Sequence, residues 1–342
     1  MLTSKQLNEI RELLEQSQNP VFFFDNDPDG LASFLLLRRY CGKGKGVAIK
    51  SFPELNVSYA RKLHELKPDI IFILDKPLVD PKFISSAREL GIAVVWIDHH
   101  PVQSIPEVHY FNPLQNKPES NEPVSFWCYQ VSRREKDMWI AMIGCLGDWF
   151  LPPFAGEFAK KYADIFDKFA TPAQALYGTE LGKIIKILSF ALKDTTSNVI
   201  KLLKALIETE SPYEILKGEK KHEQTLERFS QVSKTYLKFL EKAKNLAENN
   251  SLLWFQYSGA LSLSGELANE LFYFSPQKVI VVAYIKDNKV NISLRGKNDI
   301  RILVKKDLEG IEGTGGGHEH ACGATVHLDD LPKFRDNLIK AM

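Results

Sequence analysis

Cysteine is scarce in this chain, and long apolar runs are missing from it. The 342 residues include 4 cysteines without paired spacing, which excludes a disulfide framework and favours reduced thiols. No run approaches the ~18 to 20 apolar residues that a bilayer span requires. The start of the sequence has no basic and apolar leader. We therefore expect a soluble, cytoplasmic protein that has no membrane partner.

An excess of charge of either sign is also missing. The chain has 44 Lys and Arg against 43 Asp and Glu, which gives a formal net charge of +1. The overall field of such a protein attracts nucleic acid weakly, so any contact with nucleic acid requires a local basic groove. Internal repeats and low-complexity tracts are absent as well. With 44% hydrophobic residues, a chain of this length is expected to form two domains.

The first part of the sequence alternates apolar strands with amphipathic helices, which is typical of a doubly wound, mainly parallel sheet. We predict strands at 21–24, 47–52, 70–74, 92–97 and 108–111, and helices at 30–40, 59–65, 83–90, 123–131 and 138–146. Lys, Glu, Leu and Ala then follow at helical spacing. A hairpin at 278–285 and 290–294 and helices at 300–308 and 331–342 complete the chain. The prediction is an α/β domain at 1–155, a helical connector at 156–250 and a smaller α/β domain at 251–342.

Acidic residues come directly after three of the predicted strands. Asp25, Asp75 and Asp98 each end an apolar run. Right-handed crossovers bring the carboxyl ends of parallel strands to one rim of the sheet. Asp148 follows the helix predicted at 138–146. We expect these carboxylates to converge.

The turn after the first strand reads Asp25-Asn26-Asp27-Pro28-Asp29-Gly30. Its carboxylates are two positions apart, so a turn can direct these alternate side chains to one centre. Gly30 permits the backbone conformation that such a turn needs, and Pro28 restricts the backbone to it. Such a centre suits a divalent cation. A calcium loop is excluded because Leu37 and Arg38 stand where its downstream Glu is required. Capping of the next helix by one Asp stays open.

The run Asp98-His99-His100 adds two imidazoles to the same rim. Oxygen and nitrogen ligands together suit manganese, zinc or iron better than magnesium. Neighbouring side chains cannot all face one point, so the three residues should take different roles. A histidine pair after a strand is more often an ordinary loop. The repeated pattern of an acid after a strand is what favours a site.

A glycine-rich segment, 313–318, stands near the end of the sequence and reads Gly-Thr-Gly-Gly-Gly-His. Adjacent glycines let backbone amides approach an anion, so the composition predicts a loop that holds phosphate. An Arg at the end of a predicted strand could bind a phosphate with paired hydrogen bonds. A flexible turn and a solvated charge are the plainer alternatives. The candidate substrate-binding residues are Arg295, Gly315, Gly316, Gly317 and His318.

Together these motifs resemble those of the DHH phosphoesterases. Residues 25–30, Asp75, Asp98-His99-His100 and Asp148 are similar to the four motifs of that family, in the same order. The segment 315–318 resembles the signature of the DHHA1 domain that often follows. The resemblance covers both ends of the chain and leaves only the helical middle unassigned. It implies a catalytic first domain and a substrate-binding second domain.

The resemblance also implies two manganese ions, with magnesium or another divalent ion as the alternative, and a water activated between them. The implied metal ligands are Asp25, Asp27, Asp29, Asp75, His99 and Asp148, with Asp75 shared by both ions. His100 would face the phosphate and Asp98 would orient an imidazole. The family often has small residues after the third-strand Asp, whereas this chain has Lys76 and Pro77. We expect Lys76 to point to solvent.

The implied activity is that of a hydrolase, a manganese-dependent exonuclease that trims single-stranded nucleic acid from an end and releases mononucleotides. Lys and Ile usage and the lack of extra modules resemble compact archaeal RecJ-like proteins, including the Hef-associated nuclease type, which implies 3′ to 5′ trimming in DNA repair. Two alternatives stay open. They are a short-oligoribonuclease that also acts on nucleotide bisphosphates, and a nucleic-acid-binding repair accessory with vestigial hydrolysis. The preference for DNA or RNA stays open. The possible protein partners are a second copy of the chain and a helicase or replication protein.

Overall fold

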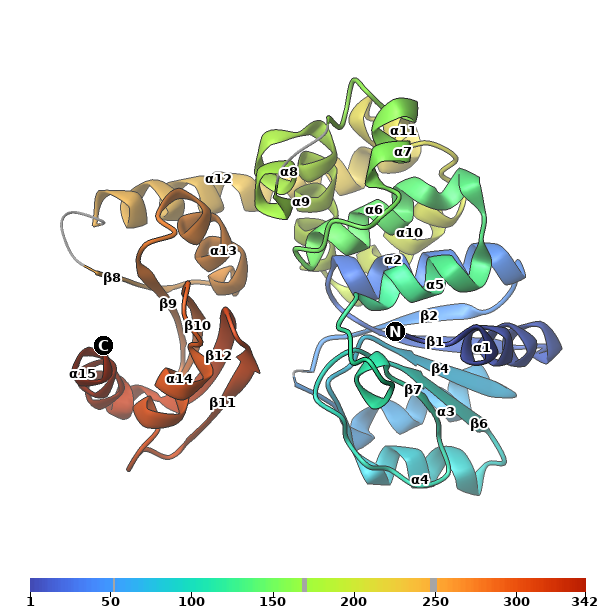
Figure 1. Ribbon diagram of the computed structural model, residues 1–342, viewed down its shortest axis with the longest axis horizontal. Coiled ribbons are helices and arrows are strands. Elements are labelled where there is room, and N and C mark those ends of the chain that lie inside the picture. The colour runs from blue at the N-terminus through green and yellow to red at the C-terminus, as the bar shows by residue number, and fades with distance from the viewer. Residues whose placement is uncertain (52, 168–170, 247–250) are drawn as a thin grey trace. The chain divides into compact units, whose positions relative to one another are not determined.

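The structure is a computed structural model that describes residues 1–51, 53–167, 171–246 and 251–342. The chain separates into two compact units, Met1–Phe229 and Ser230–Met342 (Figure 1). The predicted connector is divided between these units, and its last residues, 247–250, lie outside the described part. Among the described residues, no helix is both long and apolar enough to cross a membrane.

The first unit is built on a five-stranded parallel sheet with the order β2-β1-β4-β6-β7. Every neighbouring pair in it is parallel. Its strands are β1 (Pro20–Asp25), β2 (Lys45–Ile49), β4 (Ile70–Leu74), β6 (Ala93–Ile97) and β7 (His109–Phe111), and a separate pair is formed by β3 (Glu54–Leu55) and β5 (Leu78–Val79). The predicted doubly wound fold is confirmed. The strand predicted at 47–52 begins and ends earlier, and Phe52 lies outside the described residues.

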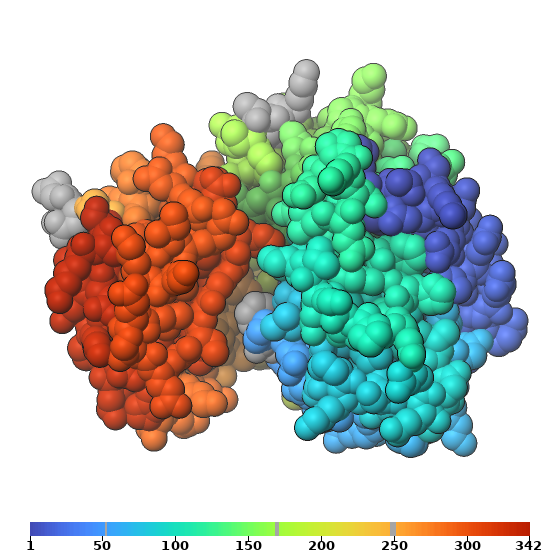
Figure 2. Space-filling view, turned by 60° about the horizontal axis from the view of Figure 1, so that its bottom comes forward, coloured from blue at the N-terminus to red at the C-terminus, as the bar shows by residue number. Residues whose placement is uncertain are grey.

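Helices cover both faces of this sheet, with α2 and α5 on one side and α3 and α4 on the other (Figure 1). The helices of the unit are α1 (Ser4–Gln16), α2 (Pro28–Cys41), α3 (Arg61–Leu66), α4 (Pro81–Glu89), α5 (Val124–Ser132), α6 (Met138–Gly147), α7 (Ala155–Lys161), α8 (Pro172–Gly178), α9 (Glu180–Leu192), α10 (Thr196–Ile207) and α11 (Pro212–Leu216). Short 3-10 turns are η1 (Val57–Ala60), η2 (Pro113–Gln115), η3 (Glu135–Asp137) and η4 (Lys220–His222). Helix α1 lies on the outside of this unit, in dark blue in Figure 2.

Alternate residues of the central strand β1 pack into two separate cores. Phe22 and Phe24 contribute to the core that also contains residues of α2 and α5. Phe23 contributes to the opposite core and meets Phe83 of α4 edge to face, with ring centroids 5.3 Å apart. Neighbouring side chains of a strand point to opposite faces. A parallel sheet covered on both faces therefore has the unbroken apolar strands seen in this sequence.

The start of α2 is fixed by residues of the acidic turn. The Asp27 side chain caps the helix, and its Oδ1 accepts a hydrogen bond from the Gly30 N–H at 2.9 Å. Pro28 occupies the first turn, where its missing N–H costs nothing. Gly42 ends the helix with a φ of 72°, a conformation that glycine adopts readily. The helix thereby holds Asp29 in its first turn, at the rim of the sheet.

A buried ion pair joins α2 to the helical part of the first unit. Arg39 Nη2 lies 2.8 Å from Asp137 Oδ1, and both side chains are buried. Arg39 Nη1 also donates to the carbonyls of Ile207, at 2.8 Å, and Thr209, at 2.7 Å, just after α10. The guanidinium thus holds the end of α10 against α2.

The second unit contains a five-stranded mixed sheet with the order β11-β12-β10-β9-β8. Its elements are β8 (Leu252–Ser258), α13 (Ser264–Phe274), β9 (Val279–Lys286), β10 (Lys289–Arg295), α14 (Arg301–Asp307), β11 (Gly313–His318), β12 (Ala321–His327), η5 (Leu328–Asp330) and α15 (Leu331–Ala341). The predicted hairpin is present as β9 and β10. Helix α12 (Glu223–Asn245) begins in the first unit and continues into the second.

The glycine-rich segment forms an edge strand, so the predicted loop was wrong. Strand β11 pairs with β12 in antiparallel register, with Gly316 opposite Gly323. Helix α14 packs closely on this strand, because a Cβ at Gly315 would lie 2.7 Å from Val304 Cγ1. The glycines are therefore explained partly by the close approach of a helix, which composition alone does not reveal.

We predict that Asp137→Ala lowers the free energy of unfolding by about 3–5 kcal/mol, because it leaves the Arg39 guanidinium buried without its anion. Urea unfolding followed by circular dichroism measures this change. The control is Arg88→Ala, which removes an exposed ion pair with Glu107 and should cost less than about 1 kcal/mol. Equal losses in the two variants would contradict a special role for the buried pair.

Candidate metal centre

The carboxyl ends of β1, β4 and β6 meet at one rim of the parallel sheet. Asp25 ends β1, and Asp75 and Asp98 follow β4 and β6. The Asp75 N–H donates to the Ile97 carbonyl at 3.0 Å, which continues the ladder beyond the strand. Asp75 has a φ of 57°, a left-handed conformation that is unfavourable for a residue with a Cβ. Such residues persist where the surrounding structure holds them, often at functional sites.

One group of donor atoms at this rim comes from three segments, namely the first turn of α2, the loop after β6 and the end of α6. Single ligand atoms of Asp29, His99 and Asp148 all lie within 4.8 Å of one another. His99 Nε2 is 3.2 Å from Asp148 Oδ2. The same nitrogen is 3.4 Å from Asp75 Oδ1, an oxygen with no hydrogen-bond partner in the described part of the chain. Two carboxylates thus approach one imidazole nitrogen from different elements.

A second group adjoins the first and contains Asp75, Asp98 and His100, again with ligand atoms within 4.8 Å. His100 Nδ1 lies 2.8 Å from Asp98 Oδ1, and its backbone N–H donates to Asp98 Oδ2 at 3.0 Å. Asp98 is fully buried and also accepts weaker bonds from Tyr110 and Asn112, both at 3.4 Å. Asp98 therefore fixes the ring of His100.

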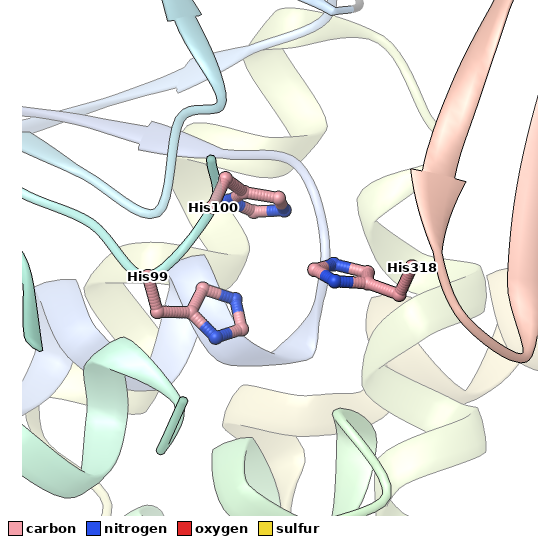
Figure 3. Close-up of side chains that lie close together, drawn as sticks. All are labelled: His99, His100 and His318. Carbon is pink, nitrogen blue, oxygen red and sulfur yellow. The ribbon is translucent and has the colours of Figure 1, made fainter. Parts of the chain in front are cut away.

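The two histidine rings stand on the loop that follows β6, as Figure 3 shows. Their centroids are 4.6 Å apart and their planes are inclined by 73°. The neighbours therefore take different partners, as the sequence predicts for adjacent side chains. His99 Nε2 approaches Asp75 and Asp148, whereas His100 Nδ1 is bonded to Asp98.

The carboxylate of Asp29 is held by the start of α5. Asp29 Oδ2 accepts the Val124 N–H at 2.8 Å, and Oδ1 accepts the Ser125 N–H at 3.0 Å as well as the Ser125 hydroxyl. Burial and the nearby charge of Asp148 raise the pKa of Asp29 to about 7, although the bonds from Ser125 and Val124 oppose the shift. Asp29 is thus oriented towards the rim by a fixed helix end.

Two further acids of the rim, Asp27 and Asp75, are also forced towards their protonated forms. Burial, followed by the charges of neighbouring carboxylates, raises the pKa of Asp27 and of Asp75 well above the usual range. Burial lowers the pKa of His99. Burial lowers the pKa of His100, but the bond to Asp98 and the charges of the nearby carboxylates together outweigh burial, so this pKa is raised. Crowded oxygen donors with too little positive charge around them fit a divalent cation.

Lys76 is buried beside this cluster, so its predicted exposure to solvent was wrong. Its side chain has no exposed surface, and Nζ lies 2.9 Å from Asp25 Oδ1 and 2.7 Å from the Ser51 carbonyl. The acidic surroundings explain the burial, because a buried charge requires an opposite charge and hydrogen bonds. Asp25 consequently pairs with a lysine, and it belongs to neither of the two groups of donor atoms.

The candidate residues of the second unit cluster at one end of its sheet. In the ladder, Arg295 of β10 and His318 of β11 both lie opposite Ala321 of the intervening β12. Arg295 Nε donates to Asn269 Oδ1 at 2.5 Å, so the guanidinium is held by α13. Gly315, Gly316 and Gly317 lie on the exposed edge strand. These residues belong to the second unit, whereas the acidic rim belongs to the first.

Some residues that shape the rim carried no recognisable signal in the sequence. Ser125 holds Asp29, and Asn112 holds both Asp98 and the His100 carbonyl. Burial of Asn112 is complete. Ser125 is 96 residues from Asp29, and neither Ser125 nor Asn112 lies in a motif, so spacing could not have linked them to the site.

The two ends of the chain match two families of domains. Residues 21–146 match the DHH family, N-terminal domain, and residues 262–342 match the DHHA1 domain. The chain therefore contains a DHH domain and a DHHA1 domain. The predicted resemblance is thus confirmed, and the two matched regions lie in the two structural units.

Solved structures with the same fold include RecJ proteins. RecJ in complex with Mn²⁺ from Thermus thermophilus has a TM-score of 0.69 and 16% identity, over 99% of this chain and 55% of that chain. Exonuclease RecJ bound to manganese has a TM-score of 0.62 and 18% identity, over 98% and 94% of the two chains. A pGpG-specific phosphodiesterase from Vibrio has a TM-score of 0.50 and 13% identity, over 95% and 98%. The comparison with curated proteins gave no match.

We predict that the protein without metal loses stability as the pH rises from about 4 to about 7. The raised pKa values of Asp27, Asp29 and Asp75 mean that the folded chain retains protons which the unfolded chain has released. Among the histidines of the rim, His100 acts in the same direction because its pKa is raised, and His99 opposes it because its pKa is lowered. Mn²⁺ takes the place of these protons, so it should raise the Tm more at pH 7.5 than at pH 5.5.

Thermal unfolding in EDTA and in excess Mn²⁺ at both pH values tests this. Asp29→Asn is the control, because it removes one titrating group and should flatten the pH dependence in EDTA. An unfolding temperature in EDTA that rises steadily over this pH range would show that the rim is not crowded with protonated acids.

Proposed function

We propose that this DHH-domain protein is a metal-dependent phosphodiesterase that hydrolyses single-stranded nucleic acid from an end and releases mononucleotides. The observation that carries the proposal is the convergence of Asp29, His99 and Asp148 within 4.8 Å, with Asp75 Oδ1 3.4 Å from the same histidine. Hard oxygen donors beside one imidazole nitrogen are a donor set suited to manganese. The fold shared with RecJ proteins supports a nucleic-acid substrate.

Two divalent ions, manganese or magnesium, are the proposed cofactor. Asp27 and Asp75 would hold one ion, and the residues that would hold the other are Asp29, Asp75, His99 and Asp148. When bound, such a pair of ions lowers the pKa of a water molecule towards neutrality and offsets charge on the phosphate. Asp25 is the least suited of the proposed ligands, since Lys76 already occupies one of its oxygens at 2.9 Å.

His100 is the proposed partner of the phosphate. Because Nδ1 is bonded to Asp98, Nε2 is the nitrogen that would face a phosphate oxygen. The raised pKa of His100 keeps the ring cationic to a higher pH, which favours charge that develops on the phosphate. Asp98 acts through the ring as a positioning residue, with Asn112 holding it in turn.

The second unit is proposed to bind the rest of the substrate. Strand β11 is the edge of its sheet, and an edge strand has a row of backbone amides without a strand partner. A Cβ at Gly316 would meet nothing within 4 Å, so this face is open to a ligand. Arg295, held by Asn269, and His318 supply polar groups at the same end of the sheet.

The favoured direction of hydrolysis is 3′ to 5′, and the favoured role is DNA repair in the cytoplasm, with a helicase or a replication protein as partner.

A second candidate function is hydrolysis of short oligonucleotides. It is favoured by the similarity in fold and length to a phosphodiesterase specific for a dinucleotide. The length of the preferred substrate separates the two.

We expect Asp75→Asn to reduce hydrolysis by at least about 10³-fold at any Mn²⁺ concentration, since it removes the ligand proposed to be common to both ions. Single strands of 2 to about 30 nucleotides, labelled separately at the two ends, give the rate, the polarity and the length preference in one assay. Mononucleotides released from long strands support the exonuclease, and cleavage of the shortest substrates alone supports the second candidate. Wild-type turnover in Asp75→Asn would contradict the proposed metal site. If the wild-type protein binds these substrates without hydrolysing them, the result would support the alternative of a repair accessory.

Gly316→Ala should raise KM for an oligonucleotide by roughly tenfold and change kcat little, because a methyl group on the open face of β11 blocks approach of the phosphate without touching the rim. Gly259→Ala in the same unit is the matched control, as a Cβ there also meets nothing within 4 Å. Steady-state kinetics of the two variants decide the question. An unchanged KM in Gly316→Ala would show that substrate does not use this strand.

A further inference from the structure

A second polar pocket lies in the helical part of the first unit, between the end of α9, the first turns of α10 and the start of α12. It is open to solvent and has a cavity volume of about 30 Å³. The residues around it include Asp194, Asn198, Lys201, Lys221, Thr225 and Arg228. None of them belongs to the motifs that the sequence offers for the metal centre.

Positive charge exceeds negative charge in this pocket, with three cations against one carboxylate. The carboxylate of Asp194 is already engaged, since its Oδ2 accepts from Asn198 Nδ2 at 3.1 Å and lies 3.7 Å from Arg228 Nε. Lys221 pairs with Glu214. Lys201 is exposed, and none of the acids that the structure describes lies within ion-pairing distance of it. The pocket therefore has charge available for an anion.

Two hydrogen-bond donors of the pocket lack an acceptor. Thr225 lines the pocket, and its hydroxyl makes no hydrogen bond within the described part of the chain, although this oxygen is not among the fully buried atoms. Arg228 Nε is buried and has no hydrogen-bond partner there. A buried donor without a partner, such as this Nε, is unfavourable and rare in native proteins. A ligand with several acceptor oxygens and negative charge would satisfy both of them, and a phosphate group has this chemistry.

Direct hydrogen bonds connect the wall of this pocket to the acidic turn of the metal centre. Asn26, between Asp25 and Asp27, donates through Nδ2 to the Leu192 carbonyl at 3.3 Å, at the end of α9. Lys50, just after β2, donates to the Asp194 carbonyl. The two sites are thus neighbours within one compact unit. A single-stranded nucleic acid whose end lies at the metal centre has further phosphates along its sugar-phosphate backbone, at short and regular spacing.

We propose that this pocket binds an internal backbone phosphate of a polynucleotide whose terminal phosphodiester lies at the metal centre. The proposal rests on the proposed function and specifies its substrate class as a strand long enough to reach both sites. A dinucleotide without a terminal phosphate has no phosphate left for the pocket, so this form is the short substrate in the test below. Affinity should therefore increase with strand length up to the point where the pocket is occupied.

The test compares Lys201→Glu with Lys204→Glu. Both lysines are exposed on α10, and only Lys201 lines the pocket, so the pair is matched in helix and in charge. The probe is a fluorescein-labelled single strand of about 20 nucleotides, measured by anisotropy in the full chain. Lys201→Glu should raise Kd at least about tenfold, and Lys204→Glu less than about twofold. With Lys201→Ala, the slope of log Kd against log salt should fall by about 0.7.

Thr225→Val provides a second variant that removes only the unpaired hydroxyl. It should weaken binding of the long strand a few-fold while circular dichroism and Tm stay as in the wild type. Hydrolysis of a dinucleotide should be equal in Lys201→Glu, Thr225→Val and the wild type, because a dinucleotide does not reach the pocket. Inorganic phosphate at millimolar concentration should compete with the long strand in the wild type and lose this effect in Lys201→Glu.

Equal effects of Lys201→Glu and Lys204→Glu on the long strand would overturn the proposal, since they would reflect general charge. Competition by inorganic phosphate without any effect of Lys201→Glu on strand affinity would also overturn it and would indicate a site for a free anion. A wild-type protein that binds the strand through Lys201 but hydrolyses no phosphodiester would refute the proposed function and leave the pocket assignment standing.

Discussion

The crowding of carboxylates at the rim of the parallel sheet is the constraint on which the rest of the first unit depends. Asp27, Asp29, Asp75 and Asp148 are brought close enough for each to affect the protonation of another. Mutual repulsion and burial both oppose this arrangement, so it persists only because other contacts hold each carboxylate in place. The start of α5 holds Asp29, and the left-handed backbone of Asp75 is held between β4 and β6.

Helix α2 connects this rim to the remainder of the unit. Its first turn contains Asp29, and Asp27 caps it. Near its other end, Arg39 binds Asp137 and the carbonyls after α10. The metal rim and the pocket beside α10 are therefore attached to the same helix, one through its start and the other near its end. The two proposed sites therefore share one helix as their support.

Much of the fold could be predicted from the sequence, because strong local patterns decided it. The apolar run 70–74 before Asp75 could only be a buried strand, and parallel topology then placed the acids at one rim. The glycine-rich segment 313–318 was expected to be a loop, because its composition indicates only that the backbone is free to adopt many conformations. Pairing with β12 and the packing of Val304 against it determined that it forms a strand. Burial of Lys76 depends on Asp25 and Ser51, which are far away in sequence. The roles of the individual site residues stay predictions, since geometry alone does not establish them.

The buried pair of Lys76 and Asp25 also limits how this chain can diverge. Loss of Asp25 alone would leave the fully buried ammonium group of Lys76 without its anion, at a cost of about 3–5 kcal/mol, which is a large part of the stability of a typical domain. Exchange of both residues for neutral ones of similar size would avoid that cost. These two positions, 51 residues apart, are therefore expected to change together or not at all in descendants of this protein.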